Sequence, residues 1–270
     1  MRGFIQIFRE IISGKSSFIK QILFILSLLL LILWITASAG SVFKTKKDLT
    51  LIALSDSLEL KKRADFVADT ASARLLKTVG FKKALLEMST TDSIGLIVNL
   101  PDSLVQLSLK GVIIHSSKAT FLKSDPLLNR LDPLVQYLLF SQPLNVNRHS
   151  ATIIKEPVVV RKAPKDTTEA RLNAWKPDTL IQKPAFLELE IQTGIRIVFS
   201  QNEKNTLKNW FVENLFHLKR KLRQTGLNIR ELIRFNWFGY VPQIRIELSA
   251  DELRSVYRAL PERAYVIIYY

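Results

Sequence analysis

The chain contains no cysteine in its 270 residues, which excludes several kinds of site at once. Disulfides, thiolate nucleophiles, zinc ribbons and iron–sulfur clusters all require cysteine side chains. The fold must therefore be stabilised by an ordinary hydrophobic core. The absence also suits a domain that folds outside the cytoplasm, where thiols are oxidised to disulfides.

Histidine is nearly as scarce, because only His115, His149 and His217 are present, with no metal-ligand spacing between them. The chain also lacks the HExxH, GxSxG, P-loop and GxGxxG motifs. We interpret serine–lysine neighbours such as Ser117 and Lys118 as surface residues. The sequence predicts no catalytic residue, no metal site and no cofactor, and it disfavours an enzyme without excluding one.

One long apolar run is present instead, because residues 21–43 carry no charge. A helix needs about 20 apolar residues to cross the hydrocarbon core of a bilayer. The rival interpretation is a cleavable signal peptide, since Ala37-Ser38-Ala39 has the small-x-small spacing of a cleavage site. The apolar core of a signal peptide is only about 7 to 15 residues long. The longer run here favours an uncleaved single-pass transmembrane helix.

Positive charges flank this run on both sides, four before it and three after it. They are Arg2, Arg9, Lys15, Lys20, Lys44, Lys46 and Lys47. The positive-inside rule then favours a cytoplasmic leader (1–20), a helix across the inner (cytoplasmic) membrane (21–43) and a periplasmic or extracytoplasmic C-terminal domain. The opposite topology would make the protein a cytoplasmic lipid or nucleic-acid tether.

The chain is strongly basic, with a net charge of +15, of which the leader supplies +3 from four basic residues and one acidic residue. Such a charge steers a protein toward anionic lipid, an anionic wall polymer or acidic partner proteins. Nucleic acid is not expected outside the cytoplasm. The candidate binding residues are a basic cluster, Lys219, Arg220, Lys221 and Arg223. A purely structural explanation of this cluster competes with a binding role. The four residues lie in the last turns of an expected helix, where cations complement the helix dipole.

Residues 44–90 are expected to form a helical stalk. Apolar residues three or four apart predict a helix over 49–88, and Gly80 is expected to break or kink it. Such a helix makes either a stalk or a cover over a sheet, and its apolar stripe offers a surface for self-association. The stripe consists of Leu60, Ala64, Val67, Ala71, Leu75 and Val79.

A β-rich lobe is expected over 91–154. Three runs with strand character, 94–100, 104–109 and 112–122, are separated by turn signals and predict an antiparallel meander. Asp125-Pro126 and Asp132-Pro133 each predict a short helix with a capping aspartate and a proline at the first helical position.

Residues 155–184 are rich in proline and charge, which is typical of a linker or long surface loop. A C-terminal α+β lobe is expected over 185–270. Its elements are a hairpin over 186–191 and 195–200, a helix over 205–223, a strand over 243–248, a helix over 250–260 and a strand over 264–270. Ser249 and Glu252 form a capping box for the last helix. The fold class is therefore α+β, with a transmembrane helix, a helical stalk and an antiparallel sheet with packed helices.

Two segments resemble parts of L,D-transpeptidase-like wall enzymes. The hairpin IGLIVNL (94–100) and LVQLSLKGVII (104–114) is similar to their first strands, and the tail over 253–268, with YRALP at 257–261, is similar to some of their C-termini. The resemblance implies a cell-envelope setting. Because those enzymes use a cysteine nucleophile and this chain has none, it implies a non-catalytic relative.

These observations lead to a single-pass, membrane-anchored, non-enzymatic scaffold or binding module of a cell-envelope protein assembly. Its partners would be other envelope proteins or a second copy, docked on exposed apolar or strand-edge surface. The alternative is a degenerate or unrecognised wall-acting enzyme or glycan binder.

Overall fold

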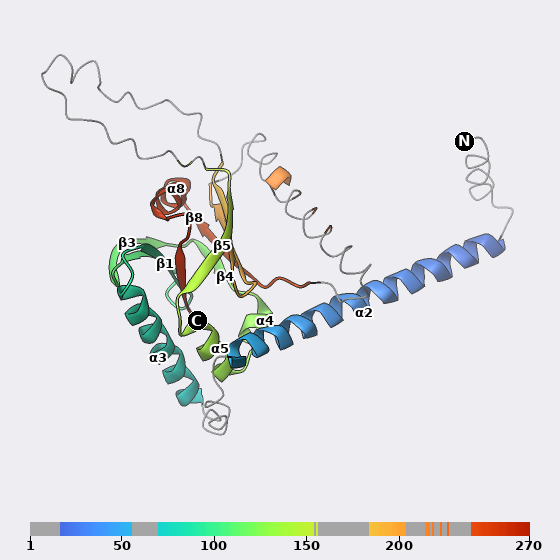
Figure 1. The fold of residues 1–270 in the computed structure, drawn as a ribbon. Helices are drawn as coiled ribbons and strands as arrows, with labels where there is room; N and C mark the ends of the chain where they lie inside the picture. Colours follow the sequence, from blue (N-terminus) through green and yellow to red (C-terminus); the bar gives the residue numbers. More distant parts are fainter. Residues whose placement is uncertain are drawn as a thin grey trace, which may run out of the picture. The chain divides into compact units, whose positions relative to one another are not determined.

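The computed structural model describes residues 17–55, 70–153, 155, 184–203, 214–216, 218, 222, 226 and 239–270. The chain divides into two compact units. The first comprises 1–47 with 224–240, and the second comprises 48–223 with 241–270. The second unit contains the sheet and is called the body below. Its elements are drawn in Figure 1.

Five helices have defined bounds within the described part of the chain. They are α2 (Ser17–Ser55), α3 (Thr70–Ser89), α4 (Pro126–Asn129), α5 (Pro133–Phe140) and α8 (Ala250–Ala259), with further helical residues at 214–216, 218, 222 and 226 in segments without defined ends. The strands are β1 (Ile94–Asn99), β2 (Leu104–Leu109), β3 (Val112–Lys118), β4 (Phe121–Lys123), β5 (Leu144–Ala151), β6 (Phe186–Ile191), β7 (Arg196–Gln201), β8 (Gln243–Leu248) and β9 (Tyr265–Tyr269).

Helix α2 contains the whole uncharged run and confirms that it is helical. Its residues Ile22–Leu54 form the one helix of the described residues that is long and apolar enough to cross a membrane. Most side chains over residues 22–36 are exposed. In the first unit, the Thr45 hydroxyl donates a hydrogen bond to the carbonyl of Tyr240 at 3.0 Å.

The last two turns of α2 belong to the body. Leu49 and Ala53, one turn apart on the same side of the helix, are both buried there. The helix therefore continues without a break from the apolar run into the hydrophobic core of the body.

The body is built on one nine-stranded mixed sheet with the order β3-β2-β1-β9-β5-β6-β7-β8-β4. β9 is parallel to β1, β8 is parallel to β7, and the other pairs are antiparallel. The expected lobes 91–154 and 185–270 contribute strands to this same sheet, because β9 lies between β1 and β5. The sheet is thus mixed and larger than the predicted antiparallel one.

The sheet closes on itself through two residues. β3 and β4 lie at opposite ends of the strand order, yet only Ala119 and Thr120 separate them in the chain. The Ala119 amide donates to the carbonyl of Ser103 beside β2 at 2.8 Å, and the Thr120 amide donates to Glu247 of β8 at 2.9 Å. The predicted strand over 112–122 is therefore a bent strand that is shared between the two ends of the sheet.

The same pairing pattern occurs twice around this closed sheet. From β3 to β5 and again from β5 to β4, the successive pairs are antiparallel, antiparallel, parallel and antiparallel. Two bent strands, β5 and β3–β4, belong to both halves. Each contains a bulge with one extra residue, Asn147 in β5 and Ile114 in β3. Bulges bend a strand and increase its twist, which closure requires.

Helix α3 covers one face of the sheet beside α5. Ala84 and Met88 form a buried cluster with Ile97 of β1 and Ile267 of β9. Gly80 does not break the helix as expected, because α3 continues through it. A Cβ atom at Gly80 would lie 3.0 Å from Cδ2 of Tyr137, so glycine permits the close approach to α5. Of the two roles predicted for this segment, residues 70–89 therefore take that of a cover over the sheet.

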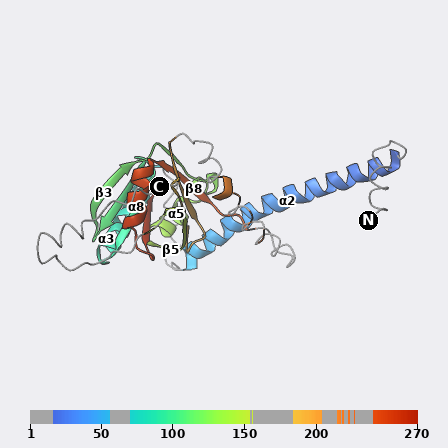
Figure 2. The ribbon, with the colours of Figure 1, turned by 90° about the horizontal axis from the view of Figure 1, so that it is seen from above.

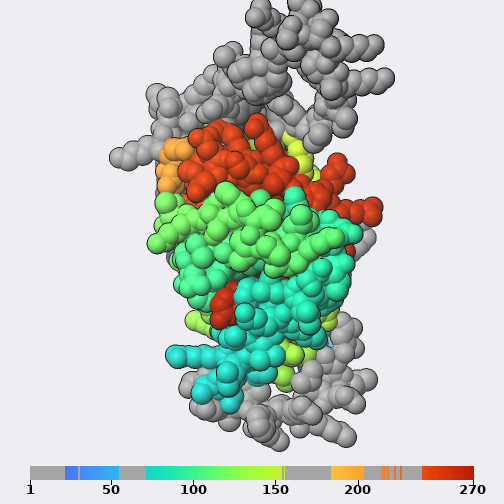
Figure 3. All heavy atoms as spheres, turned by 90° about the vertical axis from the view of Figure 1, so that its left-hand side faces the viewer, coloured from blue at the N-terminus to red at the C-terminus, as the bar shows by residue number. Residues whose placement is uncertain are grey.

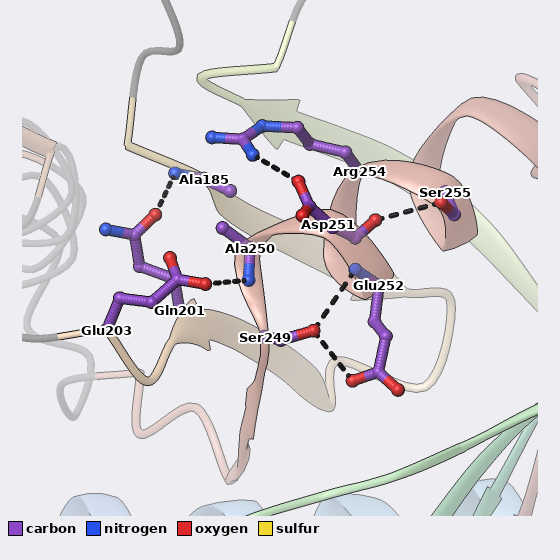
Figure 4. Close-up of polar contacts among 9 residues, drawn as sticks. All are labelled: Ala185, Gln201, Glu203, Ser249, Ala250, Asp251, Glu252, Arg254 and Ser255. Carbon is purple, nitrogen blue, oxygen red and sulfur yellow. Dashed lines mark hydrogen bonds and ion pairs between the residues drawn. The ribbon is translucent and has the colours of Figure 1, made fainter.

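The predicted helix caps are present. Asp125 and Asp132 accept hydrogen bonds from the amides of Leu127 and Leu134 at 2.9 and 2.8 Å. At α8, the Ser249 hydroxyl accepts from the Glu252 amide and donates to its carboxylate (Figure 4). The Glu203 carboxylate also accepts from the Ala250 amide at 3.0 Å, which ties the end of β7 to the start of α8. These contacts satisfy amides that a helix start leaves without intrahelical partners.

One ion pair is buried in the hairpin of β6 and β7. Nε of Arg196 lies 3.0 Å from Oε1 of Glu188, and both side chains are only 4% exposed. Removal of one partner would leave a buried charge uncompensated, whereas removal of both would not. The stability of the hairpin therefore depends on the two charges being present together.

We expect Arg196→Met to lower the free energy of unfolding by about 3 to 5 kcal/mol, and the double variant with Glu188→Leu to cost much less. Urea unfolding of the full chain in mild detergent, followed by circular dichroism, measures both. Equal losses in the single and double variants would show that the pair does not act as a unit.

Candidate docking surface

The basic cluster that the sequence nominates for binding, Lys219, Arg220, Lys221 and Arg223, lies outside the described residues. So does most of the predicted linker, of which only Lys155 and Pro184 are described. These assignments stay predictions. The search for a site therefore concerns the described part of the chain.

That part contains no group of three or more His, Asp or Glu side chains placed to hold a metal ion. His115 and Ser117 of β3 are hydrogen-bonded, with 2.9 Å between Nε2 and Oγ. Ser117 is buried, which corrects its interpretation as a surface residue, and its hydroxyl is not accessible to a substrate. His115 has no carboxylate partner within the described ranges. The pair therefore lacks the access and the orienting group of a catalytic dyad.

Two hollows among the described residues of the body have defined linings. One, of about 10 Å³, is lined by Lys77, Gln136, Tyr137 and Tyr270 among others and is the size of one water molecule. Burial lowers the pKa of Lys77, whose Nζ lies 5.3 Å from the centre of the Tyr270 ring. Burial also raises the pKa of Tyr270, and the charge of Asp125 adds to this, against the hydrogen bond to Ser124. These contacts hold α3 to the sheet.

The other hollow, of about 120 Å³, lies between the end of α2, α5 and the turn after β6. Its lining is a mixture of apolar and neutral polar side chains with the single cation Lys83. It is open and shallow, and no cluster of charges lines it. Neither hollow has the enclosed volume of a typical small-molecule site.

The most distinctive feature of the surface is where its apolar side chains gather. Outside α2 and Leu215, Leu218 and Leu222, every large apolar side chain that is exposed in the described residues lies on α3 or on β2–β4. These residues are Leu75, Val79, Leu86, Leu109, Val112, Ile113, Ile114 and Phe121. Figure 3 shows that α3, in cyan, and the following green strands form much of one face of the body. Contiguous exposed apolar surface commonly marks an interaction site.

On α3, the exposed residues follow a helical seam. Leu75, Val79 and Leu86 are 65%, 54% and 72% exposed, and Lys82 continues their spacing of four, three and four residues. These four residues are called the α3 seam below. Residues at this spacing share one side of a helix. Ala84 and Met88 lie on the opposite side of α3 and are buried against the sheet. The helix therefore has an apolar side that faces the core and another that is exposed.

On the sheet, the exposed residues lie at the tip of the hairpin of β2 and β3. Leu109, Val112, Ile113 and Ile114 are called the hairpin tip below. β3 is an end strand in the order of the described strands, but the bulge at Ile114 interrupts its ladder. A bulge blunts an edge against the addition of another strand. The hairpin tip therefore offers side chains rather than a backbone edge.

Gly111 is the residue at which the hairpin packs against the end of α3. It has φ of +78°, and a Cβ atom there would lie 2.8 Å from Cβ of Ser89. Lys110 and Asp92, on either side of this contact, form an exposed ion pair at 2.8 Å. Both ribbon views place α3 and β3 on the same side of the body (Figures 1 and 2). The α3 seam and the hairpin tip are therefore one docking face.

The docking face is basic. On α3, in the turn after it and in the hairpin, the exposed charged residues are Arg74, Lys82, Lys83, Lys110, Lys118, Glu87 and Asp92, five basic against two acidic. Of these, Lys110 and Asp92 pair with each other, and Lys83 also lines the hollow beside α5. Leu75 and Val79 belong to the apolar stripe that the sequence offers for self-association, but that stripe includes neither Leu86 nor the hairpin tip. The consecutive apolar residues Val112, Ile113 and Ile114 were the signal available in the hairpin.

No family model, no curated protein and no solved structure matches the chain.

We expect the two sides of α3 to differ in their effect on stability. Leu86→Ala should change the free energy of unfolding by less than about 0.5 kcal/mol, because the side chain is exposed. Met88→Ala, two residues away and fully buried, should cost about 2 to 5 kcal/mol. Urea unfolding compares the two. A cost at Leu86 as large as that at Met88 would mean that the seam is covered within the chain.

The contact at Gly111 predicts that two glycine-to-alanine variants differ in melting temperature. Gly111→Ala and Gly194→Ala each place alanine at φ near +80°, which costs about 1 to 2 kcal/mol. Only at Gly111 does the new methyl group also collide with α3, since nothing lies within 4 Å of a Cβ at Gly194. Gly111→Ala should therefore lower the melting temperature more. Equal shifts would show that the hairpin does not rest on α3.

Proposed function

We propose that the protein is a single-pass, membrane-anchored, non-enzymatic scaffold or binding module of a cell-envelope protein assembly. The observation that carries the proposal is the docking face, where seven large apolar side chains are exposed among basic residues on one side of the body. The scarcity of histidine and the lack of any cysteine support a binding role over catalysis.

The continuity of α2 supports a positioning role. From Phe43, the last residue of the uncharged run, to the buried Leu49 is six residues, or about 9 Å of helix. Helix α2 includes the apolar run and the residues up to Ser55. The anchor would serve to keep the docking face at the membrane, where a partner could bind it.

The proposed location is the inner membrane, with the body on the periplasmic or extracytoplasmic side. The four basic residues of the leader support this orientation through the positive-inside rule. The absence of cysteine suits an oxidising compartment. Envelope proteins with acidic docking surfaces would then be attracted to the basic docking face.

Photo-crosslinking in the cells that produce the protein tests this function. A photoreactive amino acid replaces Ile114 in the docking face or, as a control, Asn147 in β5. Both are exposed bulge residues, so the substitutions are matched in local structure. We expect position 114 to yield a discrete adduct with another envelope protein and position 147 to yield none.

A monomer without adducts from position 114, in cells and after extraction with gentle detergent, would contradict the proposed function. Equal adducts from both positions would also contradict it, because the docking face would then have no special role.

A further inference from the structure

We infer that the α3 seam binds an amphipathic helix of a partner protein whose facing residues are acidic. This inference rests on the proposed function and names the chemistry of the partner. It is carried by the spacing of the seam, by the position of Lys82 within it and by the charges beside it.

The seam has the geometry of a helix-packing surface. Leu75 and Leu86 are eleven residues apart, which is about 16 Å or three turns of helix. The spacing of four, three and four residues is that of alternating core positions in a coiled coil. Apolar side chains at this spacing insert between the side chains of a facing helix. A partner helix of three to four turns is therefore the matching shape.

Lys82 argues against a lipid bilayer as the occupant. An interfacial helix places a wide apolar face in the acyl boundary and keeps its lysines at the margins. In α3 the exposed apolar stripe is narrow, and Lys82 lies within it between Val79 and Leu86. Immersion of the stripe would carry the ammonium group into the acyl region, which is costly.

The charges argue against a second copy of the chain. An antiparallel pair of α3 seams would bring Lys82 and Lys83 of one copy close to the same lysines of the other. Like charges at such positions are destabilising. Glu87 lies one turn after Lys83 on the same side of α3 and can offset that charge, but no carboxylate lies within the seam to offset Lys82.

An acidic partner helix would avoid both the burial of an unpaired lysine in lipid and the repulsion between lysines of two copies. A single lysine among the apolar positions of a seam selects the partner and its register, because its charge must be met when it loses water. A Glu or Asp opposite Lys82, and another beside Lys83, would pair with the two ammonium groups. The apolar residues would then supply contact area and the lysines would supply selectivity.

The test uses the full chain in nanodiscs of zwitterionic lipid. Because the chain has no cysteine, Ala71→Cys gives one labelling position, exposed and one turn before Leu75. An environment-sensitive fluorophore there reports burial of the seam. The probes are three synthetic helical peptides of equal length: an apolar seam flanked by Glu, the same seam flanked by Lys, and the Glu peptide in shuffled order.

We expect the Glu peptide to shift the emission to the blue and to bind about tenfold more tightly than the Lys peptide, with no response to the shuffled peptide. Lys82→Glu should reverse the preference, and Lys82→Gln should weaken it without reversal. Lys123→Glu, the same charge change on β4 away from the seam, should leave it unchanged. This control separates a local pairing from attraction to net charge.

Equal affinity for the Glu and Lys peptides, no response to any peptide, or no effect of Lys82→Glu would overturn the inference. A blue shift in nanodiscs of anionic lipid without peptide would identify the bilayer as the occupant, and one that grows with protein concentration would identify a second copy. Either would overturn it as well. The proposed function itself fails separately, through the absence of adducts at position 114.

Discussion

Closure of the sheet by Ala119 and Thr120 is the constraint on which the rest of the body depends. The two amides bond to opposite neighbours, one beside β2 and the other in β8, so that one bent strand completes both ends of the strand order. β9 lies between β1 and β5, so segments that are distant in the chain contribute to one sheet.

The docking face follows from how this sheet is covered. α3 lies over β1 and β9, where Ala84 and Met88 are buried and Phe81 and Leu85 pack against the same cluster. Leu75 and Leu86 are exposed instead, although burying them would stabilise a free-standing fold. The hairpin tip, beside the end of α3, also leaves large apolar side chains exposed. This exposed apolar surface on two adjoining elements is what the proposed partner would cover.

Local patterns were sufficient to predict most elements of the body, and non-local ones were not. Aspartate–proline pairs identified α4 and α5, and runs of apolar residues identified the described strands other than β5, because caps and pleats are determined by near neighbours. β5 was missed, since its sequence is largely polar and it is a strand through its partners. The position of β9 and the closure at Ala119 depend on pairings across the whole chain. For the same reason, the sequence showed that Leu75 and Val79 share a side of α3 but not that this side faces solvent.

The most direct test of the account is whether the docking face is covered in the native membrane. Leu86→Cys and Asn147→Cys each provide the only thiol of the chain, and a soluble maleimide can label both in opened native membranes and after purification. The account predicts that position 86 reacts slowly in native membranes and rapidly once purified, while position 147 reacts equally in both. Equal reactivity of position 86 before and after purification would contradict it.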